Sequence, residues 1–126
     1  MKLIIAGSRT IDNLSKYFIR DLFKNLGIDF NNPDVLHEIV SGTAKGVDTC
    51  GEHFAKSYNI PLIKFPANWD NYGKKAGFIR NKQMSEYADG LVLIWDGESK
   101  GSASMKKLMI DLNKPVYEII IKKVLL

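Results

Sequence analysis

The stretch Ser41-Gly42-Thr43-Ala44-Lys45-Gly46-Val47-Asp48 lies between an apolar segment and an amphipathic segment of the chain. The apolar run before it, Val35–Val40, predicts a buried strand, whereas Val47, Cys50 and Phe54 recur at the spacing of one helix face. A strand, a turn with two glycines and a helix, in that order, indicate an α/β fold. Backbone N–H groups at the start of such a helix attract phosphate and other anions. The stretch therefore predicts a fold class and an anion site together.

The same alternation continues along the rest of the chain. Nearly continuous Val, Ile and Leu runs predict further strands at Leu3–Ala6, Leu62–Phe65, Leu91–Trp95 and Val116–Ile121. Apolar residues at helical spacing form three more stripes between them: Leu14/Phe18/Leu22/Leu26, Met84/Tyr87/Ala88 and Met105/Leu108/Met109/Leu112. We therefore expect one domain over residues 1–126 with an α/β, Rossmann-like, doubly wound sheet. It should have about five mainly parallel strands in the order 3-2-1-4-5, with helices on both faces.

The net charge of +4 is concentrated in one part of the sequence. Between Lys64 and Lys82 the chain carries five Lys and Arg residues and a single carboxylate, Asp70, so this stretch accounts for the whole surplus. A basic patch suits an anionic partner such as a nucleotide, a phosphosugar or a nucleic-acid backbone. A solvated, lysine-rich loop is the alternative interpretation.

Composition argues against several kinds of function. No run of about 18 apolar residues occurs, so we expect no membrane partner, and the short apolar start before Gly7 predicts a strand rather than a signal peptide. The single Cys50 cannot form an internal disulfide, which favours inert packing and a cytoplasmic setting. His37, expected within a strand, and His53, expected on a helix, have no Cys or carboxylate at metal-ligand spacing. We therefore predict no metal site and no cofactor.

Three segments that can bind a ligand meet in the predicted fold. Open parallel sheets bind ligands beyond the carboxyl ends of the strands, at the point where the strand order reverses, which here lies between the first and fourth strands. The ligand-binding residues expected at that edge are Gly7, Ser8, Arg9, Ser41, Gly42, Thr43, Ala44, Gly46, Asp48, Asp96, Gly97, Ser99, Gly101 and Ser102. Arg9 can grip a phosphate, and Gly101–Ser102 would present N–H groups at the start of a helix expected near Ala103. A tight turn with a solvated arginine, helix capping by Asp48 and an N-cap at Ser102 are the structural alternatives.

A fourth segment, residues 65–81, is longer than most connections in α/β folds. It contains Trp69 and Tyr72, whose rings can stack on a base, and Arg80 with Asn81, expected to start a helix that points toward the crevice. We include Trp69, Arg80 and Asn81 among the ligand-binding candidates. The alternative is that Trp69 closes the loop against the domain.

Taken together, these segments resemble the YspA/cpYpsA-related branch of the SLOG superfamily. The matching residues are Ala6–Arg9, Ser41–Asp48, Phe65–Trp69, Tyr72–Gly77, Ile79–Met84, Ala88–Asp89, Asp96–Gly97 and Gly101–Ser102. The resemblance implies a Rossmann-like domain that binds nucleotides or nucleotide-derived ligands, as a sensor or processor, often in phage and bacterial conflict systems. It covers almost the whole chain up to the fifth strand.

Two relatives within this superfamily imply different activities. The LOG-type phosphoribohydrolases cleave the N-glycosidic bond of nucleoside monophosphates, and Arg80-Asn81-x-x-Met84 resembles the start of their Arg-Lys-x-x-Met helix. Their catalytic Glu corresponds to Met105, which cannot move a proton, so hydrolysis would need Asp48, Asp96 or Glu98 as a substitute. The DNA-processing protein A family carries a similar Ser-Gly-x-Ala-x-Gly-x-Asp turn and binds single-stranded DNA.

We expect this chain to bind, sense or sequester a phosphorylated nucleotide-type small molecule rather than to act as an enzyme. The first alternative is a nucleotide N-glycosidase, with Asp48, Asp96 and Arg80 as the candidate catalytic residues. The second is single-stranded nucleic-acid binding along the basic rim. The apolar end, Val116–Leu126, predicts a homo-oligomer that covers it.

Overall fold

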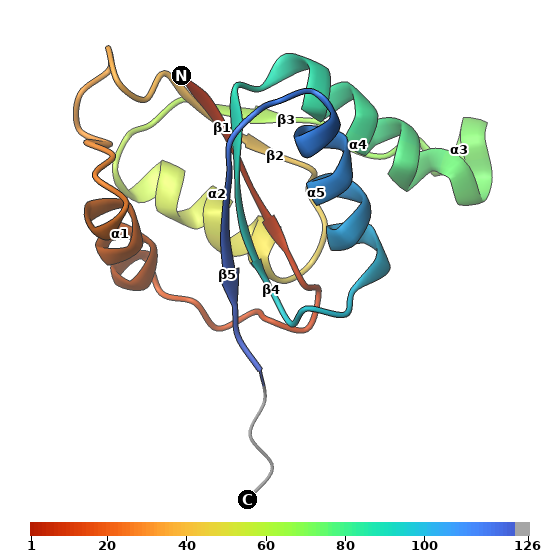
Figure 1. Cartoon of the computed structure of the whole chain (residues 1–126), viewed down its shortest axis with the longest axis horizontal. Helices are drawn as coiled ribbons and strands as arrows, with labels where there is room; N and C mark the ends of the chain where they lie inside the picture. Colours follow the sequence, from red (N-terminus) through yellow and green to blue (C-terminus); the bar gives the residue numbers. More distant parts are fainter. Residues whose placement is uncertain (123–126) are drawn as a thin grey trace, which may run out of the picture.

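The computed structural model describes residues 1–122, within which five parallel strands form one sheet. The strands are β1 (Lys2–Gly7), β2 (Glu38–Ser41), β3 (Leu62–Lys64), β4 (Gly90–Trp95) and β5 (Val116–Ile120). Their order across the sheet is β3-β2-β1-β4-β5, which confirms the predicted topology (Figure 1). The register pairs Gly7 with Ile94 and Ser41 with Lys64, so the carboxyl ends of β1, β2 and β4 lie along one edge.

Two pairs of helices cover the two faces of the sheet (Figure 1). They are α1 (Lys16–Asn25) with α2 (Val47–Ser57) on one face, and α4 (Ala76–Tyr87) with α5 (Lys100–Asp111) on the other. Alternate residues of β1 supply the two cores, since Leu3 and Ile5 pack under α1 and α2 while Ile4 and Ala6 pack under α4 and α5. The three central strands β1, β2 and β4 are therefore apolar on both faces, which is why their runs are nearly continuous in sequence, whereas the edge strands β3 and β5 carry the exposed Lys64 and Glu118.

Some local expectations were wrong. Helix α1 buries Ile19 and Phe23, whereas Phe18 of the predicted stripe is 38% exposed. Ile19/Phe23 and Phe18/Leu22 both have helical spacing, so the spacing alone could not distinguish the two faces. Strand β2 begins at Glu38, so His37 precedes it and its Nδ1 lies 2.9 Å from the terminal nitrogen of Met1. The face of α1 that is buried depends on which of its residues reach the strands, and the helical period alone does not specify which residues these are.

Two helix starts also differ from prediction. Helix α5 begins at Lys100 with Ser99 at its N-cap position, three residues before the expected start, so Ser102 is not the cap. Helix α4 begins at Ala76, so Arg80 and Asn81 lie in its second turn rather than at its start. Lys100, Gly101 and Ser102 are helical although Gly and Ser are weak helix formers, which explains why the sequence suggested a later start.

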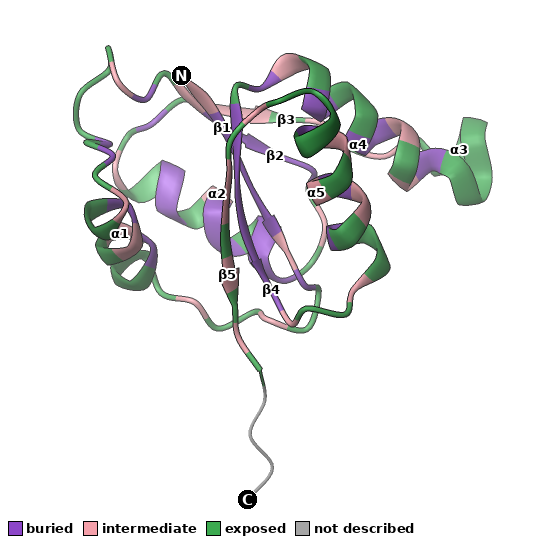
Figure 2. Cartoon of the chain, in the orientation of Figure 1, coloured by how far each residue is buried: buried purple, intermediate pink, exposed green. Residues whose placement is uncertain are grey.

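The long connection after β3 folds into a short helix, α3 (Trp69–Tyr72), and a 3₁₀ turn, η1 (Gly73–Lys75), which lead into α4. We call residues 69–75 the projection. None of its residues is buried, and α3 extends away from the sheet at the end of the molecule (Figures 1 and 2). Trp69 and Tyr72 are 52% and 49% exposed, so this connection does not close against the domain.

The predicted homo-oligomer rested on the apolar C-terminal segment. Strand β5 lies at the edge of the sheet, and Ile120 within it is 50% exposed. Residues 123–126 of that segment lie outside the described part of the chain.

Candidate functional site

A cavity of about 300 Å³ opens at the carboxyl ends of β1 and β4, where the strand order reverses. Its walls come from the loops after β1 and β4, the turn before α2, the second turn of α4 and the first turn of α5. This is the position at which open α/β sheets bind ligands. We refer to residues 7–9, 41–48 and 96–99 as the crevice loops.

Ser8 ties the three crevice loops together from beneath the cavity. Its hydroxyl oxygen accepts the Asp96 N–H at 3.0 Å and lies 2.9 Å from the Ser99 hydroxyl, and its carbonyl accepts the Val47 N–H at 3.3 Å. The side chain is 1% exposed. Gly46 must be glycine here, because its φ is +83° and a Cβ would lie 2.3 Å from the Ser8 carbonyl oxygen. Ser8 therefore joins the loops rather than facing the cavity.

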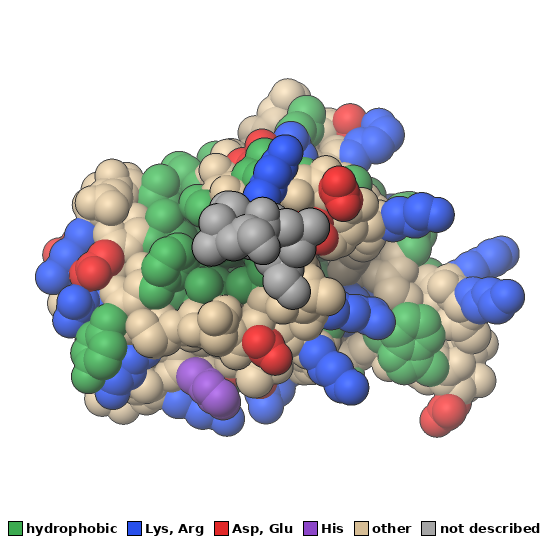
Figure 3. All heavy atoms as spheres, turned by 90° about the horizontal axis from the view of Figure 1, so that it is seen from below, with side chains coloured by type: hydrophobic (Ala, Val, Ile, Leu, Met, Phe, Trp, Pro, Cys, Tyr) green, Lys and Arg blue, Asp and Glu red, His purple; other side chains and the backbone are tan. Residues whose placement is uncertain are grey.

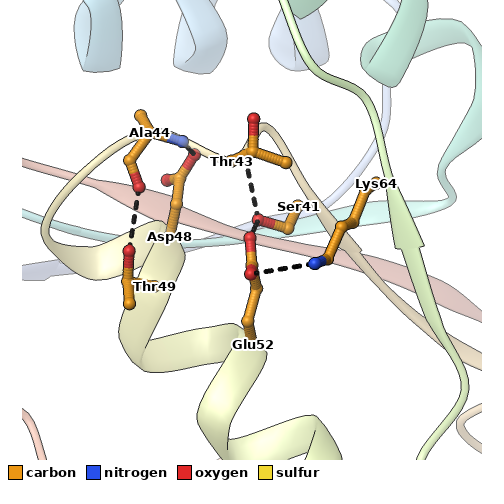
Figure 4. A network of polar contacts seen from close by, with 7 residues as sticks. All are labelled: Ser41, Thr43, Ala44, Asp48, Thr49, Glu52 and Lys64. Atoms are coloured by element: carbon orange, nitrogen blue, oxygen red, sulfur yellow. Dashed lines mark hydrogen bonds and ion pairs between the residues drawn. The ribbon is translucent and has the colours of Figure 1, made fainter.

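A hydrogen-bond network holds the turn before α2 (Figure 4). The Ser41 hydroxyl donates to Glu52 Oε2 at 2.6 Å and accepts the Thr43 N–H at 3.1 Å, and Lys64 Nζ lies 3.7 Å from Glu52 Oε1. Thr43 has a φ of +61°, a strained conformation for a β-branched residue. The network fixes this turn in a shape that its residues do not favour by themselves.

Asp48 and Arg80 converge on Gly42 at the wall of the cavity. Arg80 Nη1 donates to the Gly42 carbonyl oxygen, and Arg80 Nε donates to Asn81 Oδ1 at 2.9 Å. A Cβ at Gly42 would lie 2.7 Å from Arg80 Nη1 and 3.0 Å from Asp48 Oδ2. Glycine at this position therefore lets a guanidinium from α4 and a carboxylate from α2 approach the same backbone segment.

Burial perturbs both of these charged groups. Asp48 is 5% exposed, and this burial raises its pKa to about 6. The hydrogen bond from the Ala44 N–H, at 3.1 Å, and the positive charge of the nearby Arg80 lower the pKa but only partly offset the effect of burial. Burial also lowers the pKa of Arg80, partly offset by Asp48, although a guanidinium keeps its proton in a protein. A carboxyl group with a pKa near 6 can exchange a proton close to neutral pH.

The loop after β4 presents the start of α5 to the cavity. Asp96 Oδ1 accepts the N–H groups of Glu98 and Ser99 at 2.9 and 3.0 Å, and these bonds lower the pKa of Asp96 to about 2. The first N–H groups of an α-helix have no acceptor within it, so those of Gly101 and Ser102 are available to an anion. A Cβ added at Gly101 would meet no atom within 4 Å, so the space beside this residue is open.

The structure brings together many, but not all, of the predicted ligand-binding residues. Those that line the cavity are Gly7, Arg9, Ala44, Asp48, Arg80, Asn81, Asp96, Ser99, Gly101 and Ser102. Those that do not line it are Ser8, Ser41, Gly42, Thr43, Gly46, Trp69 and Gly97. Most of the second group shape the loops, whereas Trp69 lies on the projection.

Five residues that line the cavity were not among the predicted ligand-binding residues: Ala6, Thr10, Met84, Lys100 and Met105, of which Met105 had been matched to a relative's catalytic Glu. Lys100 was detectable, since Ser99 is a favourable N-cap residue and would have placed Lys100 in the first helical turn. Met84 and Met105 were assigned to the core, and both are at most 2% exposed while still contributing to the cavity wall.

Within residues 1–122, no group of three or more His, Cys, Asp or Glu side chains is arranged to hold a metal ion. Helices long and apolar enough to cross a bilayer are also absent from that range.

The fold is similar to two solved structures. DNA processing protein A from Streptococcus pneumoniae has 18% sequence identity and a TM-score of 0.71 over 98% of this chain and 51% of the other. DNA processing protein A from Helicobacter pylori, whose structure concerns its single-stranded DNA binding mode, has 19% identity and a TM-score of 0.64. That match covers 97% of this chain and 66% of the other, so the chain spans only part of each. No protein-family model and no curated protein matches the chain. The chain therefore shares the Rossmann-like α/β fold of these DNA processing proteins.

Proposed function

We propose that the cavity binds the phosphate-bearing part of a nucleotide or nucleotide-derived small molecule. The observation that carries this proposal is the convergence of Arg9, Arg80 and Lys100 with the first turn of α5 around one cavity. Guanidinium groups and free N–H groups at a helix start both bind phosphate well. Both are present here at the position where α/β sheets bind ligands.

The acidic side chains of the cavity suit the remainder of such a ligand. Asp96 is ionised at neutral pH and its carboxylate already accepts three hydrogen bonds from Glu98 and Ser99, so it shapes the loop. One carboxylate oxygen of Asp48 accepts a hydrogen bond from the Ala44 N–H. The carboxylate can accept a further hydrogen bond from a ribose hydroxyl. A volume of about 300 Å³ is at the lower end for small-molecule sites, which favours one nucleotide unit.

Gly101→Ala tests the proposal because it separates binding from folding. The added methyl meets nothing within 4 Å, and alanine is a better helix former, so the free energy of unfolding should rise by about 0.5–1 kcal/mol. The methyl also adds bulk to a residue that lines the cavity, at the helix turn where we expect phosphate to bind. Calorimetric titration with a panel of nucleoside mono- and diphosphates should show at least about tenfold weaker binding than wild type.

Arg9→Ala is the second variant, with Arg20→Ala on α1 as its matched control. Arg9 is exposed and lines the cavity, so its loss should weaken nucleotide binding without unfolding the chain, whereas Arg20→Ala should bind as wild type. A panel in which no nucleotide binds, or in which Gly101→Ala and Arg9→Ala bind unchanged, contradicts the proposal. Chromatography of the same mixtures for free base tests the N-glycosidase alternative, for which we expect no release.

Single-stranded DNA is the second candidate ligand. It is favoured by the likeness in fold to the Helicobacter pylori protein, whose single-stranded DNA binding mode is the subject of its structure. Binding of a labelled oligonucleotide, measured by fluorescence anisotropy at several salt concentrations, tests this candidate. The assignment to the YspA/cpYpsA-related branch and a role in phage–bacterium conflict remain predictions from the sequence.

A further inference from the structure

The projection exposes apolar surface that the fold leaves uncovered. Trp69 and Tyr72 are three residues apart in α3, both about half exposed, and every residue from Asn68 to Lys75 is exposed. Among the described residues, the main packing partners of helix α3 are η1 and α4. Exposed apolar patches rimmed by polar residues mark interaction surfaces, whereas scattered single apolar residues do not.

The indole of Trp69 lies on the same face of α4 as the cavity. A Cβ at Gly77 would lie 3.6 Å from Cη2 of Trp69, so the ring covers Gly77. Gly77, Arg80, Asn81 and Met84 follow one another at helical spacing, and the last three line the cavity. Trp69 therefore lies at the outer end of the stripe that forms the cavity wall.

The two ends of this stripe are close enough for one strand to contact both. Gly77 and Arg80 are three residues apart in α4, about 4.5 Å along the axis at 1.5 Å per residue. A single strand with a phosphate near Arg80 can therefore extend along α4 toward the Trp69 ring that covers Gly77.

The charge of the projection matches the same partner. Lys74 and Lys75 are both exposed and lie in η1, which follows α3. The projection carries one carboxylate, Asp70, so its net charge is positive. Figure 3 shows Lys and Arg side chains beside hydrophobic side chains at the end of the molecule where α3 lies. Proteins that bind single strands without sequence preference combine stacking aromatic groups with a basic surface in this way.

We propose that the projection is a docking surface for single-stranded nucleic acid, on which Trp69 stacks one base while Lys74 and Lys75 contact the backbone of a strand that continues from the cavity. This inference rests on the second candidate function and assigns it a surface outside the cavity. It does not require that a free nucleotide binds in the cavity.

The experiment measures binding of fluorescently labelled dT15 and rU15 by anisotropy, with intrinsic tryptophan emission as a second readout. Trp69→Ala should weaken binding at least about tenfold, whereas Trp69→Phe should stay within about threefold because it keeps a stacking ring. In Lys74→Ala/Lys75→Ala, the slope of log affinity against log salt should become shallower by about 1.4. The matched control Lys24→Ala/Lys56→Ala removes the same charge from α1 and α2, and should leave both quantities unchanged.

Tryptophan emission reports the geometry directly. Trp95 is 6% exposed and its indole N–H donates to Glu118 at 2.8 Å, so quenching by a stacked base should come from Trp69 and should vanish in Trp69→Phe. The proposal is overturned if dT15 and rU15 fail to bind, if they bind without quenching, or if Trp69→Ala and the double lysine variant bind as wild type. Self-association that depends on Trp69 and that dT15 does not compete with would also overturn it, in favour of a second copy as the partner.

The two proposals fail separately. Loss of nucleotide binding in the calorimetric panel, with Trp69-dependent oligonucleotide binding retained, removes the proposed function and leaves the projection as a nucleic-acid surface. Oligonucleotide binding that depends on Arg9 and Gly101 but not on Trp69 removes this inference and leaves the cavity as the site.

Discussion

The crevice loops and the projection depart from the usual distribution of side chains in opposite ways. In the crevice loops, polar groups are buried: Ser8, Ser41 and Asp48 are at most 5% exposed, and each has hydrogen-bond partners. In the projection, the large aromatic side chains of Trp69 and Tyr72 are about half exposed. The first region depends on the fold for its shape, whereas the fold does not depend on the second. Substitutions in the two regions should therefore affect stability very differently.

The largest expected effect comes from Gly7→Ala, at the base of the crevice loops. A Cβ there would lie 1.7 Å from the Ile94 carbonyl oxygen, so β1 and β4 must separate to accept it. We expect the free energy of unfolding to fall by at least about 3 kcal/mol. Urea denaturation followed by circular dichroism measures this change, and a loss below about 1 kcal/mol would show that the strands are not held at this distance.

Asp48→Asn sharpens the comparison by removing a buried charge. The pKa of Asp48 is about 6 in the folded chain, above the ordinary value of 3.8, so the folded state binds more protons than the unfolded state between pH 4 and 6. The contribution of Asp48 to stability is therefore most favourable below pH 4 and declines as the pH rises through 6. At about 1.4 kcal/mol per pKa unit, the ionised side chain destabilises the folded chain by up to about 3 kcal/mol above pH 6.

The asparagine variant should thus be more stable than wild type at pH 7.5 and nearly equal to it at pH 4. Thermal unfolding at both pH values measures the difference, with Asp70→Asn on the projection as an exposed control. A variant that is less stable at both pH values would mean that pairing with Arg80 outweighs the desolvation of the carboxylate.

Trp69→Ala should have the smallest effect on folding. Because Trp69 is 52% exposed and lies on the projection, we expect the free energy of unfolding to change by no more than about 0.5 kcal/mol. Trp95→Ala, at a position 6% exposed, should cost about 3–5 kcal/mol in the same denaturation experiment. Similar losses for the two variants would contradict the view that the fold does not depend on the projection.

The alternation of strands and helices was predictable from the sequence because the central strands are apolar on both faces and each connection between strands contains a helix. The topology follows from that alternation, and the position of the cavity follows from the topology. What the sequence did not specify is the direction of individual side chains. Phe18 and Ile19 are neighbours, and both are apolar residues at helical spacing. Which of them is buried depends on how α1 packs on the strands beneath it.

The role of each predicted polar residue was equally hard to assign. Ser8 and Arg9 are adjacent in an exposed-looking turn, yet Ser8 is buried beneath the loops and Arg9 faces the cavity. Trp69 was grouped with the crevice by its residue type, and its location depends on a short helix whose start has few sequence signals. Asn68, which accepts the Asn71 N–H at 3.2 Å as an N-cap, was the available signal.

The contacts of Ser8 have a consequence for how a ligand enters. Since Ser8 in the segment after β1 is bonded to the segments after β2 and β4, none of the three can move outward alone without breaking a bond made by Ser8. Association should therefore require little ordering of the backbone, and the entropic penalty of capture should be small. A cavity whose loops are preorganised in this way should bind its ligand rapidly and in one kinetic step.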